Sequence, residues 1–252
     1  MSILVCAHRG ASGYAPENTL EAFQLAVDQG ADAVELDVHL TRDGHLLVAH
    51  DEKVDRVSDG TGLIGEMTLA AVKKLDFSKL HPEYQDARAP TLQEVFELLA
   101  PTNLLINVEL KNSIVPYPGM EEKCLALAAK MGMEDRVIYS SFNHMSMLAI
   151  KEIFPDAVCG LLYDSVLIRP WKYAAESGMD ALHPHYQHLL YFGDYCDKAH
   201  RAGLKVNTWT VNAERDMKRV IEAGADMIIT NYPDRCLPEA PKGKKGKKRA
   251  GK

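Results

Sequence analysis

Residues 3–40, ILVCAHRGASGYAPENTLEAFQLAVDQGADAVELDVHL, contain one complete strand–helix–strand unit. Apolar runs at 3–7 and 33–40 predict two strands, and the segment between them has the apolar spacing of a helix. The pair Asn18 and Glu21 predicts a capping box at the start of this helix, and Gly30 predicts its C-terminal cap. Leu20, Phe23 and Val27 are spaced to lie on one face. The unit therefore predicts a helix packed against a parallel sheet.

The same alternation continues along the chain. Further apolar runs predict strands at 104–110, 137–140, 157–161, 179–182, 205–209 and 227–230. Thr91 and Glu94 predict another capping box, Leu92 begins an apolar helical stripe, and Gly224 predicts a C-terminal cap. Eight strands that alternate with helices predict an α/β fold, a TIM (β/α)₈ barrel over residues 1–240. An open, doubly wound sheet is the alternative.

The alternation is interrupted between Leu40 and Thr91. Here the second strand is expected to return as a hairpin, followed by a turn-rich segment with a short helix near 68–74. Such an excursion predicts a small insert after the second strand, over approximately residues 45–90, at the face of the barrel where the strands end.

Charge is distributed unevenly along the chain. The net charge is -6, yet residues 242–252, KGKKGKKRAGK, carry seven basic side chains and no acid. Residues 241–252 are expected to form a disordered basic tail, and the lack of interleaved aromatic residues argues against nucleic-acid binding.

Five widely spaced cysteines predict reduced thiols. With no signal peptide or membrane span recognised, a cytoplasmic protein is expected, and a homo-oligomer is left open.

Charged side chains gather where the predicted strands end, which is the functional face of such a barrel. Glu35 and Asp37 share one side of the second strand because they are two residues apart. The first three barrel strands together supply a histidine, two cations and three carboxylates: His8, Arg9, Glu35, Asp37, Glu109 and Lys111. Any one of them alone is typical of a surface salt bridge, but together they have no packing reason to occupy successive strand ends.

The hairpin after the second strand is expected to bring a second histidine to this face. Asp43-Gly44 suggests a two-residue turn, which would place Asp37 opposite His50. This inference depends on the length of the turn, because one additional residue would move His50 to the opposite face.

Three carboxylates at one strand-end mouth predict a metal ion between them. Oxygen-only ligands favour one divalent cation, Mg²⁺ or Ca²⁺, held by Glu35, Asp37 and Glu109. With Arg9 and Lys111 the summed charge is about +1, which suits one phosphodiester anion. His8 and His50 can exchange protons near neutral pH as an acid–base pair.

Five segments in this order resemble the glycerophosphodiester phosphodiesterase family from about residue 3 to 236: HRGASGYAPENTLEAF, ELDVHLTRDGHLLVAHD, NVELK, VNTWTVN and ITNYPD. The resemblance implies a cytoplasmic TIM-barrel hydrolase of lipid and glycerol metabolism that converts glycerophosphodiesters to sn-glycerol 3-phosphate and an alcohol. It also implies that the glycerol 2-hydroxyl attacks phosphorus first.

The resemblance further implies roles for individual residues. His8 and His50 match the acid–base pair; Glu35, Asp37 and Glu109 match the metal ligands; Arg9 and Lys111 match the phosphate-binding cations. Phe142 and Trp209 follow later strands, where similar proteins line the glycerol pocket with apolar rings. Asn18, beside Glu17, is expected to shape the loop after the first strand or to cap the helix.

The cluster of His183, His185 and His188 is not expected to bind a second metal, because Pro184 argues against a regular strand there. A substrate contact by His183 is expected instead. Five other histidines are expected at the surface and are given no role: His39, His45, His81, His144 and His200.

Two alternatives to this function remain. A phospholipase-type phosphodiesterase on the same barrel would act on lipid substrates and need an exposed apolar rim, which the sequence does not indicate outside the insert. A non-catalytic, metal-dependent binding module is the other alternative.

Overall fold

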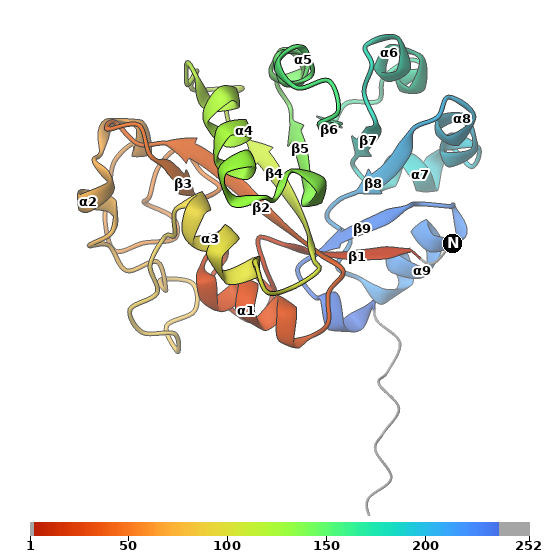
Figure 1. Cartoon of the computed structure of the whole chain (residues 1–252). Helices are drawn as coiled ribbons and strands as arrows, with labels where there is room; N and C mark the ends of the chain where they lie inside the picture. The colour runs from red at the N-terminus through yellow and green to blue at the C-terminus, as the bar shows by residue number, and fades with distance from the viewer. Residues whose placement is uncertain (1–2, 237–252) are drawn as a thin grey trace, which may run out of the picture.

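A computed structural model describes residues 3–236 of the chain, whose course is drawn in Figure 1. It contains a closed barrel of eight parallel strands. The barrel strands are β1 (Leu4–His8), β2 (Ala33–Leu40), β4 (Leu105–Leu110), β5 (Val137–Ser141), β6 (Val158–Tyr163), β7 (Ala181–Pro184), β8 (Lys205–Thr208) and β9 (Met227–Thr230). The barrel closes because β1 pairs with both β2 and β9. The predicted TIM barrel is therefore confirmed, and the open sheet is excluded.

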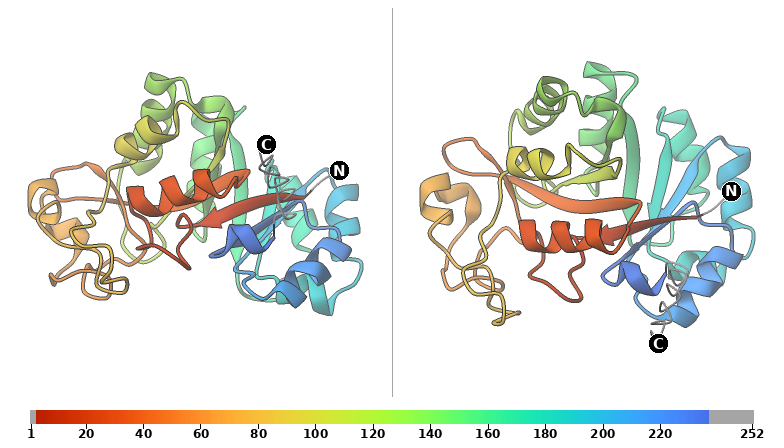
Figure 2. Two further views of the ribbon diagram at one scale, coloured as in Figure 1. Left: turned by 90° about the horizontal axis from the view of Figure 1, so that it is seen from below. Right: turned by 60° about the horizontal axis from the view of Figure 1, so that its bottom comes forward.

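Helices surround the barrel, as both views in Figure 2 show. They are α1 (Leu20–Asp28), α3 (Leu92–Leu99), α4 (Met120–Met131), α5 (His144–Ile153), α6 (Pro170–Glu176), α7 (Gln187–Tyr191), α8 (Tyr195–Arg201) and α9 (Glu214–Glu222), with short 3₁₀ turns at Glu134–Arg136 and Pro233–Arg235. The main apolar core lies between these helices and the outer side of the strands. Helix α1 buries Ala22, Phe23 and Ala26. Leu20 and Val27, which with Phe23 form the predicted stripe, pack against the same core but stay partly exposed.

Most of the predicted helix ends are confirmed. Thr91 and Glu94 form the expected capping box at α3, and Gly30 and Gly224 follow α1 and α9 with left-handed backbones. The capping box at Asn18 is wrong. The N-cap of α1 is Thr19, whose side chain accepts the N–H of Ala22, and Asn18 points into the barrel mouth instead.

The predicted insert lies beside the barrel next to β2 and α3 (orange in Figure 1). Strand β3 (Leu46–Val48) pairs antiparallel with the C-terminal residues of β2, from Val38 to Leu40. Strand β1 pairs only with the N-terminal part of β2. A 3₁₀ turn at Ile64–Glu66 and the short helix α2 (Leu69–Val72) follow. The insert has an apolar cluster separate from the main core: Leu47, Ala49, Val54, Val57, Ile64, Val72, Phe77 and Ala89.

The hairpin between β2 and β3 differs from the prediction by one residue. Thr41 donates its N–H to the carbonyl of His45, so three residues form the loop, and Gly44 adopts the left-handed backbone that closes it. The two-residue turn was therefore wrong, and Asp37 lies opposite Ala49 instead of His50.

Other expectations concern the cysteines and the ends of the chain. No disulfide joins the cysteines in the part of the chain that the structure describes, and all except Cys236 are buried. None of the helices between residues 3 and 236 has the length and apolarity needed to cross a bilayer. The tail expected at 241–252 lies outside the described residues.

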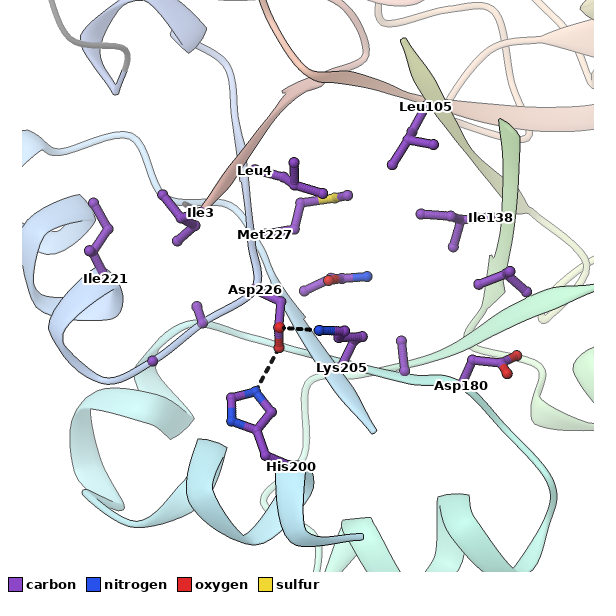
Figure 3. A pocket seen from close by; sticks show the side chains of 15 residues that line it. Ile3, Leu4, Leu105, Ile138, Asp180, His200, Lys205, Ile221, Asp226 and Met227 are labelled. Atoms are coloured by element: carbon purple, nitrogen blue, oxygen red, sulfur yellow. Dashed lines mark hydrogen bonds and ion pairs between the residues drawn. The ribbon is translucent and has the colours of Figure 1, made fainter. Parts of the chain in front are cut away.

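A hollow of about 630 Å³ opens at the N-terminal ends of the strands, opposite the predicted site (Figure 3). Apolar residues such as Ile3, Leu105 and Met227 line much of it. Three of its charged or titratable groups bind one another: Asp226 contacts His200 at 2.7 Å and Lys205 at 2.9 Å. Enzymes on this fold place their chemistry at the other end of the strands, where the predicted residues lie.

Candidate active site

Strand pairing brings the three predicted carboxylates together. In the parallel register of β2 and β4, Asp37 lies directly beside Glu109, and on the other side of β2 His8 of β1 lies beside Glu35. One oxygen from each of Glu35, Asp37 and Glu109 lies within 4.8 Å of the others. All three side chains are nearly or completely buried.

This carboxylate cluster fits a divalent cation. Burial and the repulsion from Asp37 raise the pKa of Glu35 well above its usual value and that of Glu109 to about 7. The Oδ1 atom of Asp37 is buried and accepts no hydrogen bond from the described residues. A hard cation would supply that missing partner and relieve the repulsion, so the donor set suits Mg²⁺ or Ca²⁺.

Two cations adjoin the carboxylates. Lys111 places Nζ 2.9 Å from Glu109 Oε1 and 3.7 Å from Asp37 Oδ1. Arg9 donates its backbone N–H to Glu35 at 2.9 Å and places Nε 3.5 Å from Asp37. Asp37 is buried, which alone would raise its pKa, but Arg9 and Lys111 outweigh burial and lower it. Both cations line a cavity of about 160 Å³ above the carboxylates.

His8 has one ring nitrogen bound and one free for chemistry. Its Nδ1 donates to Asn231 Oδ1 at 2.6 Å, so Nε2 is the unprotonated nitrogen, 3.9 Å from Glu35. Burial, followed by the charge of Arg9, lowers the pKa of His8 to about 3. The neutral imidazole is therefore suited to accept a proton through Nε2. Asn231 was given no role from the sequence.

His50 also reaches the cavity, although the predicted register was wrong. Strand β3 ends at Val48, and the bend that follows it turns the His50 side chain back to the mouth. Its Nδ1 donates to Asp51 Oδ1 at 2.5 Å, which fixes the tautomer and leaves Nε2 free for proton exchange. Asp51 was not predicted from the sequence, although its position directly after a candidate catalytic histidine was an available signal.

An alternating chain of charges links the two sides of the mouth. Arg56, in the insert, donates Nε to Asp51 at 2.7 Å and both terminal nitrogens to Glu17. Glu17 also accepts from Arg9 Nη1 at 2.8 Å. The phosphate-binding candidate Arg9 is thereby connected through Glu17, Arg56 and Asp51 to His50. Arg56 was not identified from the sequence, because residues 52–55 separate it from the motif.

His39 was expected at the surface. It is completely buried instead. Its Nε2 donates to the carbonyl of His50 at 3.1 Å, and its Nδ1 accepts the hydroxyl of Tyr117 at 3.1 Å. His39 thus holds the backbone of His50. Because it comes two residues after Asp37, His39 lies on the same side of β2 as the carboxylates, nearer the end of the strand.

Apolar side chains form the wall opposite the charged groups. Phe142 and Trp209 both line the cavity, with ring centroids 5.6 Å apart at 82°. Trp209 Nε1 donates to the carbonyl of His183 at 2.8 Å, which holds the indole in place. Leu162 and Ile229 complete this wall.

His183 does not line this cavity. Strand β7 continues through Pro184, contrary to the expectation, and directs His183 into the barrel, where it is fully buried. Its Nε2 lies 2.9 Å from the amide nitrogen of Asn207, and its ring lies against Gly160. This placement corrects the substrate contact expected for His183 and makes it part of the barrel interior.

The expectation of no exposed apolar rim outside the insert was also wrong. The loops and helices that follow β4 to β7 expose large apolar side chains: Ile114, Phe142, Met145, Val166, Leu167, Ile168, Tyr191 and Phe192. Ile168 is 93% exposed and Ile114 is 76% exposed. A rim of this kind is typical of proteins that contact apolar partners.

Comparison with known proteins agrees with this geometry. Residues 8–235 match the sequence model of the Glycerophosphoryl diester phosphodiesterase family. A glycerophosphodiester phosphodiesterase of Caldanaerobacter subterraneus subsp. tengcongensis is 44% identical, covering 96% of this chain and 100% of its own. A phosphodiesterase of Oleispira antarctica, solved in complex with the product sn-glycerol-3-phosphate, is 32% identical over 92% of this chain and 94% of its own, with a TM-score of 0.82. A putative glycerophosphoryl diester phosphodiesterase of Silicibacter pomeroyi is 26% identical over 93% and 91%, with a TM-score of 0.84.

Proposed function

This chain belongs to the glycerophosphoryl diester phosphodiesterase family of enzymes, and we propose that it hydrolyses glycerophosphodiesters to sn-glycerol 3-phosphate and an alcohol with a divalent cation and a histidine pair. The observation that carries the proposal is the buried triad of Glu35, Asp37 and Glu109 within 4.8 Å. The product-bound Oleispira relative supports the choice of glycerol 3-phosphate. Membership of a family of enzymes argues against the alternative of a non-catalytic binding module.

The proposal assigns the carboxylates to the cation and the basic side chains to the phosphate. Mg²⁺ or Ca²⁺ between Glu35, Asp37 and Glu109 would stabilise negative charge on the phosphoryl group and favour ionisation of the glycerol 2-hydroxyl. Arg9 and Lys111 bind the phosphate oxygens, and their own carboxylate partners keep them oriented. Phe142 and Trp209 cover the carbon atoms of the glycerol.

Two histidines exchange the protons. His8, neutral because of burial, accepts a proton from the attacking 2-hydroxyl through Nε2, while His50 donates one to the leaving alcohol. The roles reverse when water opens the resulting cyclic phosphate. An attacking hydroxyl tethered to the phosphorus has the advantage of effective molarity over free water.

Release of glycerol 3-phosphate from a panel of glycerophosphodiesters tests the proposal. Full removal of divalent metal should abolish release, and Mg²⁺ or Ca²⁺ should restore it. His8→Ala and His50→Ala should each lower kcat by about 10² to 10⁴ with the fold intact by circular dichroism. Undiminished turnover in metal-free enzyme would refute the metal requirement, and near-normal turnover in a variant would remove that histidine from the mechanism.

The apolar rim favours a second candidate, a phospholipase-type activity on lipid phosphodiesters. Ile168 is 93% exposed, precedes Arg169 in the loop after β6, and lies at the same face as the cavity. Its replacement by Asp should lower activity on lysophospholipid micelles but leave water-soluble diesters unaffected. Equal loss on both substrates, or no loss on micelles, would count against the lipid substrate.

A further inference from the structure

The catalytic cavity continues into a second hollow. The inner hollow contains His8, Arg9 and His50, whereas an outer hollow of about 140 Å³ lies beside the insert. The two share Glu109, Lys111 and Phe142 as walls. A phosphodiester whose phosphorus lies near Lys111 can therefore place one ester arm in each hollow. With the glycerol against Trp209 in the inner hollow, the alcohol arm lies in the outer one.

The outer hollow has one carboxylate, Glu52, that forms no ion pair within the described chain. Lys111 and Glu109 bind each other at 2.9 Å, and both are already assigned to the phosphate and the cation. Glu52, which comes from the insert, makes no side-chain hydrogen bond or ion pair with any residue between 3 and 236. An alcohol arm with a positive charge would complement this carboxylate.

Besides Ser113, the remaining walls of the outer hollow are the apolar side chains of Ile114 and Phe142. Phe142 is 40% exposed and Ile114 is 76% exposed, and both face this hollow. The edge-to-face contact with Trp209 fixes the ring of Phe142, so one side of the ring stays available to a ligand. An aromatic ring beside a carboxylate is the combination that binds quaternary ammonium groups, which carry charge and have apolar methyl surfaces.

We propose that the outer hollow, formed by Glu52, Ile114 and Phe142, binds a quaternary-ammonium alcohol, so that the preferred substrate is a glycerophosphodiester of choline. This inference rests on the proposed function and adds the choice of alcohol to it. A neutral alcohol such as glycerol leaves Glu52 without a partner. The primary ammonium of ethanolamine would contact Glu52, but it has no methyl groups to cover Phe142 and Ile114.

A matched pair of substrates isolates the effect of the charge. Glycerophosphocholine is compared with the glycerophosphodiester of 3,3-dimethylbutanol, which has the same shape and no charge. The wild-type enzyme should favour the choline diester by about 5- to 10-fold in kcat/KM, the range of a partly exposed carboxylate and ring acting on one cation. The difference should lie mainly in KM, because the headgroup contact is the same before and during reaction.

Glu52→Gln should bring this ratio close to one. Glu66→Gln is the matched control: Glu66 lies in the same insert and is exposed outside both hollows, and the change removes the same charge. It should keep the wild-type ratio. A wild-type ratio near one, or a ratio that Glu52→Gln does not change, would overturn this inference while leaving the proposed function in place. If neither diester is hydrolysed with divalent metal present, the proposed function fails, and this inference fails with it.

Discussion

Asn18 and Asp37 bind each other twice: the Asn18 amide nitrogen donates to Asp37 Oδ2 at 2.8 Å, and its oxygen accepts the Asp37 backbone N–H at 3.3 Å. To reach this position Asn18 adopts a left-handed backbone, with φ of 59°, at the residue before the N-cap of α1. The side chain expected to cap a helix therefore orients a candidate metal ligand.

Replacement of Asn18 by Asp should weaken divalent-metal binding by about 10- to 100-fold, as loss of a group that orients a ligand does elsewhere. The shape is retained, but an acceptor replaces the donor facing Asp37. Isothermal titration with Mg²⁺ and Ca²⁺ measures the change. Unaltered affinity in a folded variant would mean that Asn18 only shapes the loop.

His39→Phe should lower kcat by about 10- to 100-fold with little change in KM, because the carbonyl of His50 loses its only side-chain donor among the described residues. Tyr117→Phe removes only the hydroxyl that binds His39 and should have a smaller effect. Steady-state kinetics on a water-soluble diester separates the two parameters. A raised KM with normal kcat would contradict a role in positioning His50.

Asp51→Asn should change how stability depends on acid. Burial would raise the pKa of Asp51, but hydrogen bonds from Arg56 and His50 outweigh it and lower the pKa to about 2. A lowered pKa stabilises the fold above the unfolded value of 3.8, and this contribution is lost as pH falls from about 4 to 2. The variant should therefore lose stability at pH 5 to 7 and show a shallower decline in melting temperature below pH 4. If the melting temperatures of wild type and variant fall in parallel as the pH is lowered, the bonds of Asp51 to Arg56 and His50 contribute nothing to stability.

Gly160→Ala should destabilise the barrel by about 1 to 3 kcal/mol, the usual cost of overfilling a packed interior. An added Cβ would lie 2.2 Å from His183 Nε2, and His183 is completely buried. Combining Gly160→Ala with His183→Ala should cost less than the sum of the single changes, because the clash is removed. Denaturant unfolding of the four proteins measures this coupling; additive effects would exclude the contact as its cause.

Removal of the glycerol 2-hydroxyl from the substrate should lower kcat/KM by several orders of magnitude, since the tethered nucleophile is lost. The deoxy diester retains its phosphate and should act as a competitive inhibitor through Arg9 and Lys111. Turnover of the deoxy and parent diesters under saturating metal is the comparison. Similar rates would show that water attacks phosphorus directly.

The candidate site was predictable from the sequence to the extent that it depends on parallel strands. Glu35, Asp37 and Glu109 could be grouped because parallel strands end on one face and residues two apart share a side. The turn at Asp43-Gly44 could not be assigned, since a two-residue and a three-residue loop accept the same residues there. His50 reaches the cavity only through the bend after β3, which no periodicity encodes.

The interior positions were harder to predict for a different reason. His39 and His183 are polar residues on strands, and the sequence does not state whether a hydrogen-bond partner will be near. Each is buried because a partner far along the chain is present: Tyr117 for His39 and Asn207 for His183. Partners so far apart in sequence become visible only when the barrel is closed.

The two histidines of the proposed acid–base pair lie in parts of the chain with separate apolar clusters. His8 lies on a barrel strand within the main core, whereas His50 follows β3 and belongs to the insert, whose small apolar cluster is its own. Regions with few buried contacts open at lower free energy than the global transition. Local opening of the insert would remove His50, Asp51 and Arg56 from the mouth while the barrel persists. Catalytic activity would then report the local stability of residues 46–90. Heat or denaturant would abolish activity before the barrel unfolds.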